Sequence, residues 1–171
     1  MDERSPLSYV GNGLQQVAFV VKDLAAAQEF FNRKMGIPRF CVIDNFGEKV
    51  ADTTFRGQPV KHNFRLALAY SGDTQIELIQ HLSGETCYKE HIERRGEGLH
   101  HLGFFLYDFE AYQRALAELS TAGYPVLMSG RWGTTRYTYL DTEAAIGSIM
   151  EIVYLDSEGK EFMAKIKRGE F

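Results

Sequence analysis

Cysteine is scarce in this chain of 171 residues, which has only Cys41 and Cys87. The two lie far apart and form no CxxC pair, so the sequence offers neither a disulfide framework nor a thiolate metal motif. Clusters of lysine and arginine are also missing, and the formal net charge is −4. Because phosphate binding needs clustered positive charge, we expect no nucleic acid partner.

Long apolar runs are absent as well. No window approaches the ~20 apolar residues that cross a bilayer. The polar start of the chain, Met1 to Ser8, has no apolar stretch like that of a signal peptide. We therefore expect no membrane partner and a cytoplasmic location. What the chain does have is an ordinary globular composition, 44% hydrophobic and 25% charged, which is enough for a core without disulfide or metal staples.

The sequence repeats itself at a constant offset of 85 residues, the distance from Gln16 to His101. The stretch 15–28 matches the stretch 100–113 without a gap, and their apolar positions agree throughout. The identical pairs are Phe19 and Phe104, Asp23 and Asp108, Ala26 and Ala111, and Gln28 and Gln113. Such self-similarity indicates two copies of one structural module.

Each copy predicts a strand, a helix and three further short strands. The first strand is rich in Val, Phe and Leu, and an Asp follows that can cap the first turn of a helix. The helices are predicted over Leu24–Met35 and Phe109–Ala122, and the glycines Gly36 and Gly123 end them. The later strands are predicted at Arg39–Ile43, Asn63–Tyr70 and Thr74–Gln80, and at Val126–Ser129, Arg136–Asp141 and Ser148–Tyr154.

This order of elements predicts an α+β fold of two tandem βαβββ modules. We expect the first module over residues 13–82, a linker over 83–98, the second module over 99–155, and a C-terminal tail over 156–171. The first copy carries an additional polar stretch, Asp44 to His62, which predicts a long loop.

Four polar residues interrupt the apolar strands at matching positions of the two copies. Gln16 and His101 begin the first strand of each copy, and Glu77 and Glu151 lie within the last strand. Either Glu alone could face solvent. The same exception in both copies instead favours one buried divalent metal site, because a buried carboxylate needs a partner charge. These donors suit Zn, Ni, Co, Mn, Fe or Mg and do not distinguish among them.

Two small residues share a strand face with these donors. Ala18 lies two residues after Gln16, and Gly103 lies two residues after His101. They leave room beside a metal, or they let a helix pack closely against the strand. The sequence leaves both interpretations open.

At these residues the sequence resembles the vicinal oxygen chelate superfamily, whose members include glyoxalase I and methylmalonyl-CoA epimerase. Residues 14–23 are similar to the entry strand of glyoxalase I, and residues 95–102 to the entry of the second epimerase module. The similarity covers about residues 13–155. It implies an open, barrel-like cup of mixed sheet in which Gln16, Glu77, His101 and Glu151 bind one divalent metal ion.

The resemblance also implies an activity, which is proton transfer next to a metal-bound carbonyl group. Glu151 matches the position of the catalytic base. We therefore expect an isomerase, epimerase or lyase that acts on a small carbonyl compound. An acyl-CoA, as in methylmalonyl-CoA epimerase, and the substrate of a lactoylglutathione lyase are the two candidates. Modules of this type often pair across chains, so a homodimer is a further expectation.

Two segments depart from the epimerase pattern. Residues 59–63 lack the second acid/base Glu of epimerases, and His62 could transfer protons there or be an ordinary surface residue. Residues 129–142 do not look like the usual epimerase segment and contain a glycine-rich loop. Its Arg131, Arg136 and Tyr139 could clamp an anionic or aromatic substrate, or the segment could simply lead into a strand.

Two other functions remain open. An extradiol-type dioxygenase needs two His and one carboxylate on Fe(II), and Gln16 stands where the second His is expected, which ranks this function lower. A non-catalytic binding or resistance protein would hold a small molecule in the same cup. Relatives of that kind often lack the metal ligands, so the four ligand-like residues disfavour it, and metal analysis separates it from the enzymes.

Overall fold

The computed structural model describes residues 13–171, and the expectation made for Met1 to Ser8 lies outside them. The strands are β1 (Gln16–Val20), β2 (Cys41–Ile43), β3 (Ala51–Phe55), β4 (Gln58–Pro59), β5 (Asn63–Ser71), β6 (Thr74–Ser83), β7 (Gly98–Leu106), β8 (Val126–Trp132), β9 (Thr135–Leu140) and β10 (Ile149–Tyr154). The helices are α1 (Leu24–Met35), α2 (Cys87–Arg95), α3 (Phe109–Thr121), α4 (Glu143–Ile146) and α5 (Ser157–Arg168), with a 3-10 helix, η2, at Phe46–Lys49.

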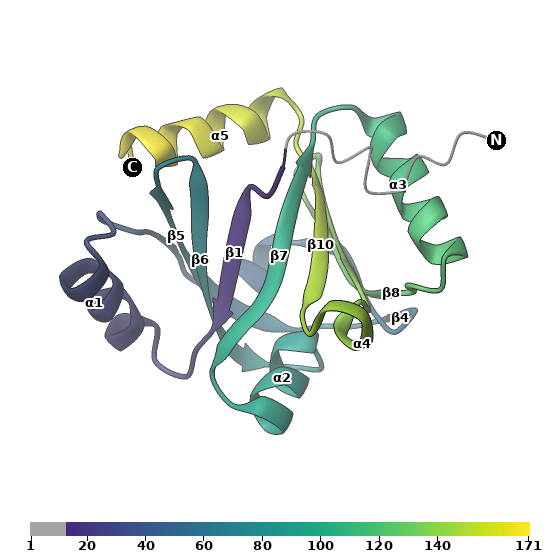
Figure 1. Ribbon diagram of the computed structural model, residues 1–171, viewed down its shortest axis with the longest axis horizontal. Coiled ribbons are helices and arrows are strands. Elements are labelled where there is room, and N and C mark those ends of the chain that lie inside the picture. The colour runs from purple at the N-terminus through teal and green to yellow at the C-terminus, as the bar shows by residue number, and fades with distance from the viewer. Residues whose placement is uncertain (1–12) are drawn as a thin grey trace.

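The ten strands form one curled mixed sheet in the order β2-β5-β6-β1-β7-β10-β9-β8-β3-β4. In Figure 1, α1 and α3 flank the sheet, α2 and α4 lie at its lower end, and α5 crosses its upper end. The predicted α+β fold, a barrel-like cup built from two copies of one module, is confirmed.

The duplication sets the strand order at the centre of the sheet. The first and last strands of each copy pair in parallel, β1 with β6 and β7 with β10. The two copies join where β1 pairs antiparallel with β7. Strands that lie far apart in sequence therefore become four immediate neighbours, β6, β1, β7 and β10.

The two predicted helices form for the local reasons that the sequence indicated. Asp23 accepts a hydrogen bond from the Ala26 backbone N–H at 3.0 Å, and Asp108 accepts one from Ala111 at 2.7 Å. Gly36 ends α1 in the left-handed conformation, at φ 67°. These caps place the start and end of α1 where the sequence predicted them.

The long loop predicted over residues 44–62 is wrong. The segment contains η2, β3 and β4, and β3 pairs antiparallel with β8 of the other copy. Thr54 and Ser129 face each other across this pair, with their hydroxyl oxygens 2.8 Å apart. β3 covers the edge of β8, and its residues other than Phe55 stay exposed or half-buried. Their polar side chains conceal the strand pattern in the sequence.

The segment 129–142 forms a β-hairpin, and the strand predicted over Arg136–Asp141 is present as β9. β8 runs on to Trp132, a turn follows in which Gly133 has φ 59°, and β9 begins at Thr135. Alternate residues of β9 face the interior of the cup, which stabilises the hairpin. Two further helices, α2 and α5, lie in the segments expected to be a linker and a tail. The module boundaries themselves stay a prediction.

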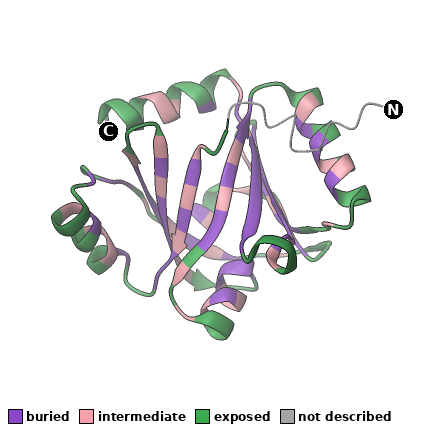
Figure 2. Cartoon of the chain, viewed as in Figure 1, coloured by how far each residue is buried: buried purple, intermediate pink, exposed green. Residues whose placement is uncertain are grey.

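The apolar core has three parts, and burial is highest along the central strands (Figure 2). One part fills the cup itself. A second packs α1 against β5 and β6, with Leu24 and Phe31 against Ala67 and Leu78. The third packs α3 against β9 and β10. Among residues 13–171, none of the helices combines the length and apolarity that a membrane crossing requires.

Candidate metal centre

The four polar strand residues meet inside the cup. Gln16, Glu77, His101 and Glu151 lie on β1, β6, β7 and β10, which are consecutive in the sheet. All four are at most 7% exposed. The parallel pairings place Ala18 beside Glu77 and Gly103 beside Glu151. The small side chains of the first strands thus stand next to the carboxylates of the last strands.

The Nε2 atom of His101 lies at the centre of this cluster. It is 3.2 Å from Gln16 Oε1, 3.2 Å from Glu77 Oε2 and 3.3 Å from Glu151 Oε2. One ligand atom each from Glu77, His101 and Glu151 lies within 4.8 Å of the others. Oxygen and imidazole donors at this spacing could hold one divalent cation.

The charges of the cluster fit such a cation. Two carboxylates are buried here, and Glu77 Oε2 has no hydrogen-bond partner, although it lies close to His101. Burial raises the pKa of Glu77, whereas His101 acts in the opposite direction. Burial also disfavours the charged form of His101, but Glu151 and Glu77 outweigh it and raise the pKa of His101 to about 9. Without a metal, His101 therefore carries the positive charge that the carboxylates need.

A second amide sets which end of Gln16 faces the cluster. The Nε2 atom of Gln16 donates to Oε1 of Gln75 at 2.8 Å, so the Gln16 oxygen points toward His101. Gln75 is fully buried on β6, and its own Nε2 donates to Tyr70 OH and to the sulfur of Met163, both at 3.1 Å. This series of hydrogen bonds connects the cluster to Met163 of α5.

A β-bulge turns two successive histidines toward one another. The pairing of β1 with β7 passes from Ala18 opposite His101 to Phe19 opposite Leu99, which leaves His100 without a partner in the ladder. The Nδ1 atoms of His100 and His101 lie 2.8 Å apart. Burial, together with His101 and His91, holds the pKa of His100 well below its usual range. A neutral His100 can accept the Nδ1–H of His101, which leaves Nε2 of His101 free for a metal.

Gly103 makes room for Gln16. A Cβ atom at residue 103 would stand 2.8 Å from the Cβ of Gln16 and would overlap its amide group. The two residues are direct partners in the β1–β7 ladder. The small residue thus lets the Gln16 side chain lie across the neighbouring strand.

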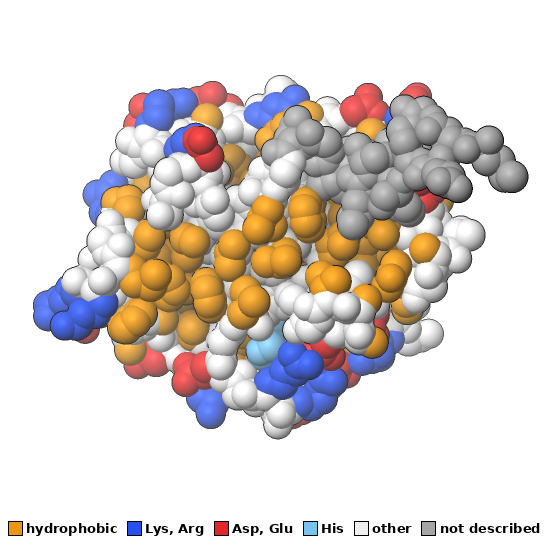
Figure 3. Space-filling model, viewed as in Figure 1, with side chains coloured by type: hydrophobic (Ala, Val, Ile, Leu, Met, Phe, Trp, Pro, Cys, Tyr) orange, Lys and Arg blue, Asp and Glu red, His pale blue; other side chains and the backbone are white. Residues whose placement is uncertain are grey.

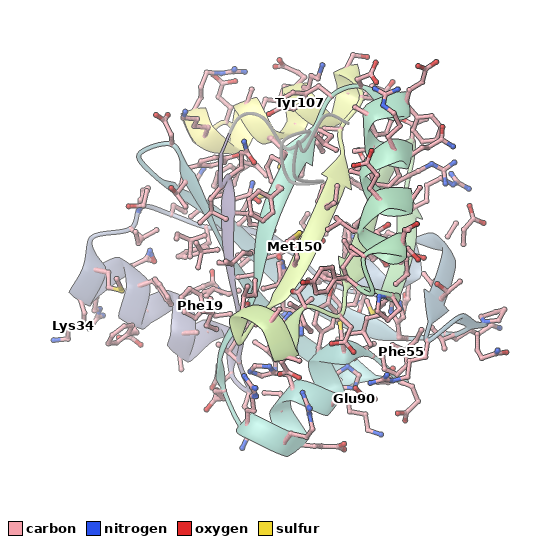
Figure 4. All side chains as sticks on the ribbon, turned by 45° about the vertical axis from the view of Figure 1, so that its right-hand side comes forward. Phe19, Lys34, Phe55, Glu90, Tyr107 and Met150 are labelled. Carbon is pink, nitrogen blue, oxygen red and sulfur yellow. The ribbon has the colours of Figure 1, made fainter. Side chains whose placement is uncertain are left out.

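Gln16, Glu77 and Glu151 of the cluster line a cavity of about 600 Å³, a volume that includes its opening to solvent. Aromatic and aliphatic side chains from several strands, η2, α2 and α5 line the cavity. They are Ile43, Phe46, Phe64, Leu66, Leu68, Tyr88, Phe105, Trp132, Tyr137, Tyr139, Val153, Phe162 and Met163. The polar residues in its wall are Gln16, Gln75, Glu77, Thr135 and Glu151. Figure 4 shows Tyr107 beside α5, where Lys160 lies 4.7 Å from the centre of its ring.

The remaining predicted site residues lie in different places. Tyr139 lines the cavity, and its hydroxyl is 2.7 Å from that of Tyr88. Arg131 instead donates to Asp52 at 2.8 Å. Arg136 lies 5.5 Å from the ring centre of Phe109. Neither arginine lines the cavity.

His62 is buried, and neither of its ring nitrogens has a hydrogen-bond partner. Burial lowers its pKa, so the ring is neutral at pH 7. It packs against Phe64, which in turn packs against Tyr88. His62 does not line the cavity.

Sequence reasoning missed Gln75, His100 and Met163. Gln75 could have been found, because it lies two residues before Glu77 and so shares its strand face. His100 could not, since its orientation depends on the bulge. Met163 belongs to α5, which no site motif marks.

Residues 15–139 match a family model described as the Glyoxalase/Bleomycin resistance protein/Dioxygenase superfamily. The match spans well over half of the chain. The chain belongs to this superfamily. Its cup, its duplicated modules and its buried His/Glu/Glu group are what the resemblance led us to expect. No curated protein matches the sequence.

Solved structures share the superfamily fold with this member. The methylmalonyl-CoA epimerase from Mycobacterium tuberculosis is 20% identical, with a TM-score of 0.63, and the match covers 87% of this chain and 91% of that one. A methylmalonyl-CoA epimerase in complex with methylmalonyl-CoA and NH4+ is 22% identical, with a TM-score of 0.60, covering 82% and 92%. A hypothetical protein from Bacillus halodurans is 18% identical, with a TM-score of 0.60, covering 84% and 94%. At these identities the similarity shows the fold alone.

Proposed function

We propose that this protein is a divalent-metal-dependent isomerase, epimerase or lyase that moves a proton beside a substrate carbonyl group. One observation carries the proposal. Gln16, Glu77, His101 and Glu151 converge within a buried cluster, and three of them line a largely apolar cavity. A structural core has no need of two such carboxylates, because burying them is costly without a cation.

The residues of the chain divide the work. Gln16, Glu77, His101 and Glu151 would hold the ion, which when bound withdraws charge from a carbonyl oxygen and so acidifies the neighbouring carbon. Glu151 and Glu77 are the charged groups in the cavity wall. We assign the proton transfer to Glu151. We assign no step to His62, which packs against Phe64 and does not line the cavity.

Two substrate types are compatible with this chemistry. The epimerases with the same fold include one in complex with methylmalonyl-CoA, so an acyl thioester is the first candidate. A thiohemiacetal of the glyoxalase type is the second. We further propose that two chains pair as a homodimer.

The metal requirement is tested first. Purified protein, grown with adequate metal, is analysed for bound ions and for the thermal stabilisation produced by Zn, Ni, Co or Mn. We expect a bound ion and a raised melting temperature. A preparation that holds no metal and gains no stability from any of the four contradicts the proposal and leaves a binding protein as the alternative.

The proton transfer is tested with Glu151→Gln. Deuterium incorporation from solvent is measured for branched acyl-CoA esters and for the adduct of methylglyoxal with glutathione. We expect the variant to lose about a hundredfold or more of the exchange rate. Glu158→Gln, an exposed residue of α5, is the matched control. Normal exchange in Glu151→Gln removes Glu151 as the base.

A further inference from the structure

The cavity wall carries no positive charge. Among residues 13–171, no lysine, arginine or histidine lines the cavity, and the charged groups in its wall are the carboxylates of Glu77 and Glu151. The arginines that the sequence suggested for an anionic substrate are engaged elsewhere. Arg131 pairs with Asp52, and Arg136 lies against Phe109. A negative group on a substrate would thus find no partner in this wall.

Aromatic rings form a continuous side of the cavity. Trp132 lies between Phe162 of α5, at 4.9 Å between ring centres, and Phe46 of η2, at 5.6 Å. Phe46 continues to Phe64 of β5 at 5.5 Å. Edge-to-face contacts of this kind suit a further aromatic or bulky apolar group placed against them.

The charge of the cluster leads to the same conclusion. The carboxylates of Glu77 and Glu151 offset the charge of one divalent cation, which leaves the site neutral. A carboxylate on the substrate would then be buried without a counter-charge, which is strongly unfavourable. A neutral apolar group meets no such penalty and gains from the burial of its surface.

We infer that the substrate is an uncharged carbonyl compound, free or as the acyl part of a thioester, whose reacting carbon carries an aromatic or bulky apolar group. The inference rests on the proposed function for the place of the carbonyl, and on the cavity wall for the rest of the molecule. A substrate with a carboxylate beside the reacting carbon, such as methylmalonyl-CoA, does not fit this wall.

Binding of matched probes tests the inference. Trp132 is the only tryptophan of the chain and lies in the wall, so its fluorescence reports on occupancy. Protein loaded with Co²⁺ is titrated with benzohydroxamate, para-carboxybenzohydroxamate and acetohydroxamate, which share one chelating group. We expect benzohydroxamate to bind about tenfold or more tightly than either of the others. Equal or tighter binding of the carboxylated probe overturns the inference.

A charge placed in the wall gives a second test. Phe162→Arg puts a cation beside Trp132, and we expect it to reverse the order, so that para-carboxybenzohydroxamate binds more tightly than benzohydroxamate. Phe162→Leu should keep the original order. Phe30→Arg, at an exposed position of α1, places the same charge elsewhere and should also keep it. An unchanged order in a folded Phe162→Arg variant contradicts the inference.

A metal-free pair separates this inference from the proposed function. Acetophenone and para-acetylbenzoate are compared on protein treated with a chelator, by equilibrium dialysis and by Trp132 fluorescence. Preference for acetophenone in protein that binds no metal would support the cavity inference while the metal proposal fails. Metal binding together with preference for para-acetylbenzoate would support the metal proposal and contradict the cavity inference.

Discussion

Gln75 illustrates how one buried side chain controls another. An amide group can present either its oxygen or its nitrogen, and only the oxygen of Gln16 can bind a metal. Because Gln75 Oε1 accepts from Gln16 Nε2 at 2.8 Å, the amide is held with its oxygen toward His101. Outer hydrogen bonds of this kind orient metal-binding residues, and their loss typically lowers metal affinity about tenfold to a hundredfold.

We predict that Gln75→Leu weakens metal binding about tenfold to a hundredfold. The loss of the acceptor frees the Gln16 amide to turn. Gln75→Glu keeps an acceptor oxygen and should restore part of the affinity. Titration calorimetry with Ni²⁺ and the absorption spectrum of the Co²⁺ form measure the effect. Gln80→Leu is the control. Gln80 lies on β6 like Gln75, but its side chain bonds the backbone of Lys22 and Leu24 and not the cluster. Equal losses in both leucine variants would show a purely structural effect.

The protonation of His101 predicts how metal binding depends on pH. Its pKa in the metal-free protein is about 9, so at pH 7 the ring is protonated and must lose a proton before Nε2 can bind a metal. Because this pKa is raised, protons compete with the metal for Nε2 of His101 at every pH below about 9. The competition is strongest at low pH and disappears above the pKa. We predict that metal affinity rises about tenfold per pH unit between about pH 6 and 8. Calorimetry in buffers of different ionisation enthalpy should detect the proton release, and an affinity that is flat over this range would contradict the prediction.

At the scale of elements, the close approach of β1 and β7 shapes the cluster. Gly103 is the direct partner of Gln16 in this ladder, and no other residue leaves space for the Gln16 side chain to cross the strand. The bulge at His100 belongs to the same strand pair. The geometry of four ligand residues thus depends on how two strands from different copies pair.

We predict that Gly103→Ala destabilises the metal-free protein by about 1–3 kcal/mol, because the new methyl group overlaps Gln16. Urea denaturation measures the loss. In the double variant Gly103→Ala with Gln16→Ala the overlap is gone, so its loss should be smaller than the sum of the single losses by about 0.5 kcal/mol or more. Additive losses would mean that the space at residue 103 serves another purpose.

The elements divide into those that local sequence predicts and those that it does not. The strands and helices repeated in both copies were predictable, because β1 and β7 have apolar runs and Asp23 and Asp108 cap the helices that follow. β3 was not, since its polar residues form a strand only through pairing with β8. α5 was not, because Phe162 and Met163 find their partners in distant strands of the cup.

The candidate site shows the same division. The paired exceptions Gln16, Glu77, His101 and Glu151 could be predicted from the repeat, and the structure brings them together. Arg131 and Arg136 were assigned to the substrate on charge alone, although the side on which a β-hairpin residue points depends on register. The register turns Tyr139, and not the arginines, toward the cavity.

At the scale of the whole molecule, residues 13–171 leave the outer face of the central strands incompletely covered. α1 and α3 flank this face and leave its middle strands open between them (Figure 1). Val17 lies there beside Ile76 on one side and Leu102 on the other, and all three are half-buried. Figure 3 shows hydrophobic side chains gathered over this part of the molecule. Exposed apolar faces of this kind mark protein contacts in soluble proteins.

The proposed homodimer would cover that face with a second copy of the chain. We predict that the protein sediments as a dimer at micromolar concentration, and that Leu102→Lys converts it to a monomer, because the charge would be buried at the centre of the interface. Ile146→Lys, at an exposed position of α4 at the lower end of the sheet, should leave the dimer intact. Analytical ultracentrifugation distinguishes the species. If the unmodified protein is a monomer, or if Leu102→Lys remains dimeric, the pairing through this face is wrong.

Binding of Ni²⁺ to the Leu102→Lys monomer shows whether the metal centre needs the second chain. Since all four donors come from one chain, we expect the Ni²⁺ affinity of the monomer to stay within about twofold of that of the dimer.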